Sequence, residues 1–130
     1  MRNLFVLAIV ATAAFLSSCS GDEHHVEIHF HNPADGATIA TADAAALEIE
    51  VHFESEEELH EVEVLLYPTD AANDVIIDFE EHAHETEYEF TQTVDLSAFD
   101  SGTSFTLEAI TCEDHDCTES HSEKITFTLE

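Results

Sequence analysis

The chain has 130 residues, of which 30 are acidic, 10 are histidine and only two are lysine or arginine, giving a formal net charge of −28 at pH 7. A surface this acidic repels nucleic acid and anionic lipid headgroups and attracts cations, so nucleic-acid binding is excluded as a function. High charge with few apolar residues would predict disorder, but the apolar residues here alternate regularly, which predicts one small folded domain.

The first 18 residues have the features of a secretion signal. Arg2 is followed by an apolar run at residues 4–16, which is shorter than the roughly 20 residues of a membrane span. Residues 16–19, Leu-Ser-Ser-Cys, resemble the lipobox of bacterial lipoproteins. The resemblance implies cleavage of residues 1–18, a lipid on Cys19 as the first mature residue, and attachment to the cell envelope. An ordinary signal peptide with a stray cysteine is the alternative.

Residues 19–23 are expected to form a short acidic tether after the lipid, and residues 24–130 a single domain. An acidic cluster just after the cysteine resembles surface-displayed lipoproteins of some bacteria with an outer membrane. This implies that the protein is held at the outer membrane or the cell surface by its lipid anchor. No later segment of the sequence is apolar enough to cross a bilayer.

Seven segments of the domain alternate apolar and polar residues, the pattern of half-buried strands. They lie at residues 26–30, 47–53, 62–66, 75–79, 88–96, 105–109 and 125–129. No segment has convincing helical spacing, although residues 42–46 would permit a helix. Seven short strands separated by polar turns predict an all-β fold, an antiparallel sandwich of two sheets.

Both ends of the domain resemble known β-sandwich modules. Residues 32–39, Asn-Pro-Ala-Asp-Gly-Ala-Thr-Ile, are similar to the opening of many bacterial immunoglobulin-like and fibronectin type III-like modules, and residues 102–109 and 120–129 are similar to their last two strands. The resemblance implies a seven-stranded Ig-like sandwich in an extracytoplasmic setting. It does not imply a function, because unrelated functions share this fold.

The loop between the last two predicted strands contains Cys112 and Cys117. Outside the cytoplasm, two cysteines this close are expected to form a disulfide. The alternative is a metal site that uses both thiolates with His115 and an aspartate, although this spacing is not a strong zinc signature. Even with the disulfide formed, residues 114–116 would be displayed on a tight loop able to bind a cation.

The first candidate metal site lies on the first predicted strand. His29 and His31 are two residues apart, so both side chains leave the same face of the strand, with His25 and Glu27 beside them. If this strand pairs with the second, His52 lies on the adjacent row. Imidazole with carboxylate suits Zn²⁺, Cu²⁺ or Ni²⁺. A simply solvated polar face is the alternative.

A second, weaker candidate site contains His82 and His84, flanked by acidic residues and expected in a loop or edge segment. Its alternative is again a solvated surface. His60 and His121 stand alone in the sequence, so solvent-exposed or hydrogen-bonded roles are expected for them.

The sequence therefore predicts a lipid-anchored binding module for divalent transition metal, serving as a buffer or delivery module beside an outer-membrane transporter or surface complex. An adhesion or interaction module with no specific metal is the alternative. We do not expect an enzyme, because catalytic metal sites need a shaped pocket with an open coordination position.

Overall fold

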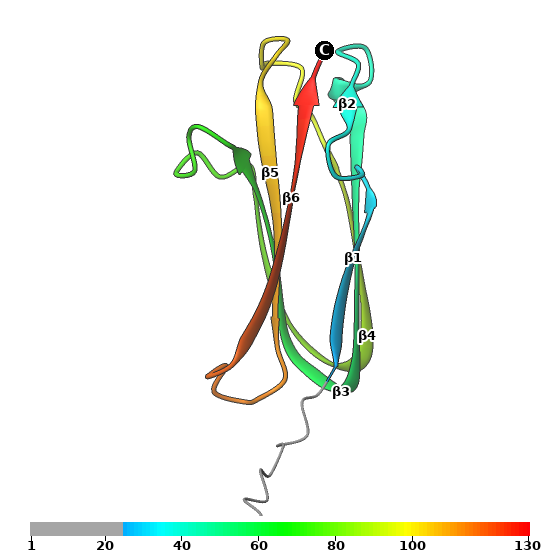
Figure 1. The fold of residues 1–130 in the computed structure, drawn as a ribbon, viewed down its shortest axis with the longest axis vertical. Helices are drawn as coiled ribbons and strands as arrows, with labels where there is room; N and C mark the ends of the chain where they lie inside the picture. The colour runs from blue at the N-terminus through cyan, green and yellow to red at the C-terminus, as the bar shows by residue number, and fades with distance from the viewer. Residues whose placement is uncertain (1–24) are drawn as a thin grey trace, which may run out of the picture.

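A computed structural model describes residues 25–130. The predicted signal peptide, Cys19 and the tether lie outside this range. The described chain is mostly strand and forms a curled all-β sheet (Figure 1). Its elements are β1 (Val26–Asn32), β2 (Thr38–Ile39), the 3-10 helix η1 (Ala44–Ala46), β3 (Leu47–Pro68), β4 (Ile77–Val94), β5 (Ser104–Cys112) and β6 (Ser120–Leu129).

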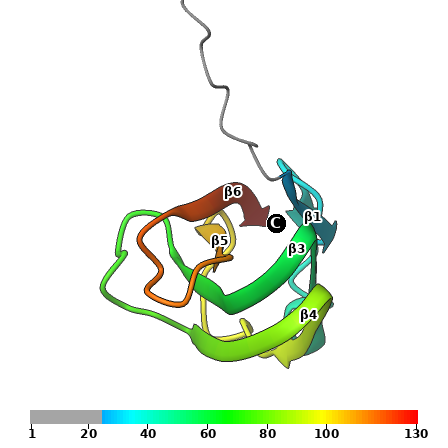
Figure 2. The ribbon, with the colours of Figure 1, turned by 90° about the horizontal axis from the view of Figure 1, so that it is seen from below.

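The strands follow the order β1-β3-β5-β6-β2, and β4 pairs with β3. All pairs are antiparallel except β2 with β6, which is parallel. Seen from below, β3 and β4 bend together, so β1 lies near one end of β3 while β5 and β6 lie near the other (Figure 2). The sheet thereby curls around its own apolar side chains.

The seven predicted segments are contained in fewer, longer strands. The second and third fall in β3, and most of the fourth and fifth (residues 77–79 and 88–94) fall in β4, so the described chain has six strands when β2 is included. The expected break at residues 55–58 is not a turn, because it contains no glycine or proline and its backbone continues as strand. Register shifts between Glu54 and Glu61 mark where β3 bends.

The bend reverses which residues of β3 face inward. In its first half the buried side chains have odd numbers, including Ile49, Val51 and Phe53, whereas in its second half they are Val62, Val64 and Leu66. A strand that alternated strictly would turn polar residues inward after the bend. The irregular pairing at the bend shifts the alternation by one residue, so apolar side chains face the core in both halves of β3.

The core contains most of the residues predicted to face inward. Its largest fully buried side chains are Phe53, Phe105, Phe127, Ile49, Leu59, Leu66, Leu96, Leu107, Leu129, Val51, Val62 and Val64. Val75 is an exception: it was expected in a strand but precedes β4 and is 43% exposed. The predicted turn at residues 32–36 is confirmed, with Gly36 at φ +73°, a backbone conformation that glycine adopts readily.

Candidate metal-binding surfaces

The outer face of β1 and β3 brings the predicted rows of histidine and glutamate together. Across the β1–β3 pair, His29 is the direct partner of His52, and Glu27 is the partner of Glu54. The sequence predicts His52 beside His29 if these two strands pair, and this register places it there. Residues directly opposite in an antiparallel pair have Cβ atoms about 4.5–5.5 Å apart, so their side chains share one surface.

Three imidazole rings form a triangle on this face, which we call the sheet-face cluster: His29, His31 and His52. Their ring centroids are 6.5 Å apart for His29–His31, 6.4 Å for His29–His52 and 6.0 Å for His31–His52. A shift of register between Phe30 and Asn32 places His31 at an irregularity of β1.

His52 has an unusual nitrogen. Its Nε2 atom is buried and has no hydrogen-bond partner among the described residues. A buried polar atom without a partner costs roughly 1–3 kcal/mol, and such exceptions commonly mark a missing water or ion, or a functional role. This nitrogen lies on the ring that is close to both other members of the sheet-face cluster.

Glu27 links two histidines at the edge of the cluster. Its carboxylate contacts Nε2 of His25 at 2.6 Å and Nε2 of His29 at 3.0 Å. These hydrogen bonds lower the pKa of Glu27 below its ordinary value. Donor atoms of Glu27, His29 and Glu54 also lie within 4.8 Å of one another. All of these side chains are substantially exposed, so an ion can reach them directly from solvent.

His82 and His84 lie elsewhere, in β4, which borders the sheet beside β3. Both are exposed, and Ala83 between them is buried. Nδ1 of His82 is 3.7 Å from Glu61, and Nδ1 of His84 is 3.1 Å from Glu58. They are in an edge strand as anticipated, but they have ordered carboxylate partners instead of being in a loop.

His60 has a hydrogen-bonded role, as expected, but it also lies in a group of histidines that the sequence did not indicate. Its ring centroid is 5.4 Å from that of His82, 5.6 Å from His84 and 4.8 Å from His115. Its Nε2 atom is also 3.1 Å from Nδ1 of His115. No local pattern predicts this grouping, because His60 and His115 are 55 residues apart. His121 lies in β6 with an exposed side chain, opposite Thr111.

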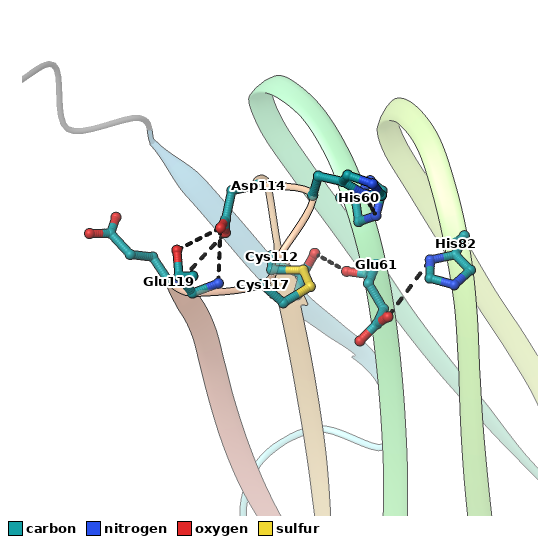
Figure 3. The surroundings of a disulfide bond; sticks show 10 residues. His60, Glu61, His82, Cys112, Asp114, Cys117 and Glu119 are labelled. Atoms are coloured by element: carbon teal, nitrogen blue, oxygen red, sulfur yellow. Dashed lines mark hydrogen bonds and ion pairs between the residues drawn. A yellow bond between two sulfur atoms is a disulfide. The ribbon is translucent and has the colours of Figure 1, made fainter.

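Cys112 and Cys117 are at disulfide distance, as predicted. Their Cα atoms are 5.3 Å apart, within the roughly 7 Å limit for a disulfide. Figure 3 shows the pair at the base of the loop, with Asp114 turned toward Glu119 and Glu61 turned toward His82. The carboxylate of Glu61 lies within 4.8 Å of both sulfur atoms, so the alternative thiolate site would gain a carboxylate that the sequence did not indicate.

Comparisons with protein-family models and with curated proteins find no match for this chain. Within residues 25–130, no helix is long and apolar enough to cross a membrane.

Proposed function

We propose that this protein is a lipid-anchored, extracytoplasmic Ig-like module that binds a divalent transition metal, Zn²⁺, Cu²⁺ or Ni²⁺, at the sheet-face cluster. The observation that carries the proposal is the buried Nε2 of His52, which lacks a hydrogen-bond partner within residues 25–130 and lies in a triangle of three imidazoles. A metal ion bound at this nitrogen would satisfy it. Glu27 and Glu54 would supply the carboxylate ligands, and His25 would remain a further donor at the rim.

The arrangement of ligands favours binding at little conformational cost. His29 and His52 project from paired strands, so their backbones are already fixed before an ion arrives. Ordering a residue costs about 1–2 kcal/mol of backbone entropy. Folding has already ordered these residues, so metal binding does not incur this loss again. Only side-chain rotations are needed to close the triangle, since Zn²⁺ holds imidazole nitrogens at about 2.0–2.1 Å.

The Ig-like sandwich is supported by how the long strands divide at their bends. The first half of β3 pairs with β1 and the C-terminal half of β4, whereas the second half of β3 pairs with β5 and the N-terminal half of β4. These two groups would be the two facing sheets of the sandwich. A metal site on the outer surface of one sheet leaves the core between them undisturbed.

Anchoring and location rest on the sequence of residues 16–19. A lipid on Cys19 would hold the domain at the outer membrane or the cell surface, where it would serve as a metal buffer or deliver metal to a neighbouring transporter or surface complex. We propose binding and not catalysis, because the hollow beside the sheet-face cluster, lined by His25, Glu27 and Glu54, has a volume of only about 170 Å³, smaller than the roughly 300–1,000 Å³ of ligand pockets.

Isothermal titration calorimetry with Zn²⁺, Cu²⁺ and Ni²⁺ tests the proposal. The His29→Ala, His31→Ala double variant is compared with the unsubstituted protein and with His121→Ala, which removes an exposed histidine outside the sheet-face cluster. The affinity of one bound equivalent of metal should be weakened in the double variant and retained in the control. Equal binding by all three proteins would place the site elsewhere. Binding no tighter than millimolar in all of them would favour an adhesion or interaction module with no specific metal.

A further inference from the structure

We propose a second transition-metal site at the bend of the sheet, formed by four imidazoles from three separate segments of the chain. This bend cluster consists of His60 in β3, His82 and His84 in β4, and His115 in the loop between β5 and β6. It is distinct from the sheet-face cluster, because residues 55–59 at the bend of β3 separate His60 from His52. It therefore goes beyond the proposed function and does not depend on it.

The irregular pairing at the bend explains how His60 reaches both histidines of β4. Leu59 pairs with Glu85, and Glu61 pairs with His82. Between these pairs β3 has only His60, whereas β4 has Ala83 and His84, so one residue faces two. Such a bulge re-aims side chains that regular pairing would keep apart. His60 and Glu61 both remain partly exposed between the buried residues Leu59 and Val62.

The ring spacings fit shared coordination. Two imidazoles that bind one ion at about 2.0–2.1 Å and at a tetrahedral angle place their ring centroids roughly 5 Å apart. The three spacings around His60 are 4.8, 5.4 and 5.6 Å. Those of the sheet-face cluster are all 6.0 Å or more. Each pair that includes His60 is therefore nearer to this spacing than any pair of the sheet-face cluster, and we expect the bend cluster to be the tighter of the two sites once its side chains rotate onto an ion.

The contact between His60 and His115 supports the same conclusion. Nε2 of His60 and Nδ1 of His115 are 3.1 Å apart, and one of these nitrogens must accept the hydrogen bond from the other. The accepting ring is therefore neutral on that nitrogen, which is the form that ligates metal. For an ion to bind both nitrogens, the donating ring must carry its proton on its other ring nitrogen, so that both nitrogens facing the ion have a free lone pair.

Each of the two histidines of β4 contacts a carboxylate of β3. Glu61 contacts His82, and Glu58 contacts His84, in each case through Nδ1. The contact between Glu58 and His84, at 3.1 Å, is a hydrogen bond, and a carboxylate that hydrogen-bonds the second ring nitrogen fixes the orientation of a metal-binding histidine. Glu61 and His82, at 3.7 Å, form a longer ion-pair contact. Nε2 of each ring is the nitrogen that remains for the ion.

The disulfide acts as a positioning element for His115. It closes a loop with a sequence separation of five. Asp114 stabilises the loop further by accepting hydrogen bonds from the backbone N–H of Thr118 at 2.9 Å, its hydroxyl at 2.6 Å, and the backbone N–H of Glu119 at 3.4 Å. These contacts restrain the segment that carries His115 before metal arrives, which reduces the entropy lost on binding.

Cu²⁺ is the probe of choice, because an imidazole-rich site binds it strongly and its nitrogen ligands are visible by electron paramagnetic resonance. We compare the unsubstituted protein, His60→Ala with His115→Ala, His29→Ala with His31→Ala, and His121→Ala. The tighter equivalent of Cu²⁺, with a spectrum of several nitrogen ligands, should be lost only in the His60/His115 double variant, with affinity reduced at least about tenfold.

The outcomes separate the two proposed sites. Loss of the tight equivalent in the His60/His115 variant alone supports the bend site, even if the sheet-face variant shows that the other proposal fails. Retention of that equivalent in the His60/His115 variant, at the affinity of His121→Ala, overturns the bend site. Circular dichroism of each variant establishes that the fold is kept.

A second measurement tests the positioning role of the disulfide with a variant in which serines replace both cysteines, so that no free thiol of the loop can bind the metal. A Cys112→Ser, Cys117→Ser variant is titrated with Zn²⁺, which does not exchange electrons with the protein. Affinity at the bend cluster should fall by about tenfold while the sheet-face cluster is unaffected. Unchanged affinity at the bend cluster would show that the loop places His115 without the disulfide.

Discussion

His29 and His52 face each other directly across β1 and β3, and the Nε2 atom of His52 is buried there without a hydrogen-bond partner among the described residues. Replacing His52 with phenylalanine removes this polar atom and keeps a ring that suits a strand. The metal-free His52→Phe variant should gain about 1 kcal/mol of unfolding free energy, yet bind metal more weakly at the sheet-face cluster. Urea unfolding with chelator present, paired with calorimetry, measures both effects.

The control for this prediction is His121→Phe, which changes an exposed histidine of β6. It should alter neither the metal affinity nor the stability by more than about 0.5 kcal/mol. A His52→Phe protein that is less stable without metal and binds metal normally would show that His52 is a structural residue only.

Alternation in the sequence was sufficient to predict the face on which most residues lie. Ile49, Val51 and Phe53 are buried, and His52 lies outside beside His29, because a strand with one buried face has only one acceptable register. The same reasoning could not predict that β3 continues through residues 55–58. Polar residues at this point look like a break, although their backbones remain extended.

The bend cluster was beyond prediction for a related reason. His60 and His115 meet only because β3 pairs with β5 and because an irregular pairing turns His60 outward. Neither the register of distant strands nor the position of a bulge is encoded in a local pattern of polarity. His82 and His84 were recognisable as a pair by their spacing, but their partner was not.

Leu59 should be one of the most sensitive core positions. It is fully buried at the bend of β3, where both flanking segments change register. Leu59→Ala should reduce the unfolding free energy by about 2–5 kcal/mol, because the cavity left at an irregular site is not easily refilled. Val75→Ala, at a side chain that is 43% exposed, should change it by less than about 0.5 kcal/mol. Equal midpoints in urea for the two variants would contradict this account of the bend.

Salt should stabilise the protein. Glutamates face glutamates across paired strands, as at Glu54–Glu87 and Glu63–Glu80, and the net charge is −28. The Debye length falls from about 30 Å at 0.01 M to about 10 Å at 0.1 M salt, so repulsion is screened over this range. The melting temperature should therefore rise with sodium chloride when chelator is present. A flat or falling curve would mean that the charges are too dispersed to affect stability.

Cys19→Ser should prevent lipid attachment, since the side chain of serine lacks the thiol that would carry the lipid. The variant is expected to stay unprocessed or to leave the membrane fraction, whereas Ser18→Ala keeps a small residue before Cys19 and should be processed normally. Fractionation with mass spectrometry of the mature N-terminus measures the outcome. An unmodified Cys19 in the membrane-bound, unsubstituted protein would rule out the lipoprotein assignment.

The pH dependence of the unfolding free energy at Glu63 tests how neighbouring carboxylates affect stability. Partial burial, together with the nearby charges of Glu80, Asp78, Glu61 and Glu108, raises the pKa of Glu63 above its ordinary value. The folded state therefore holds this proton more tightly than the unfolded state does, so ionisation of Glu63 opposes folding at every pH above its folded pKa. This destabilisation disappears as the pH falls below the unfolded value of 4.5.

Glu63→Gln removes the charge while preserving the shape of the side chain. At pH 7 the variant should be more stable than the unsubstituted protein by up to about 1 kcal/mol, the scale of interactions between partly exposed charges. The difference should shrink as the pH is lowered through the folded pKa and approach zero below pH 4.5. Glu123→Gln, at an exposed position of β6 opposite Ala109, is the matched control for the loss of one charge. If both variants gain the same stability at pH 7, overall charge and not the surroundings of Glu63 determines the effect.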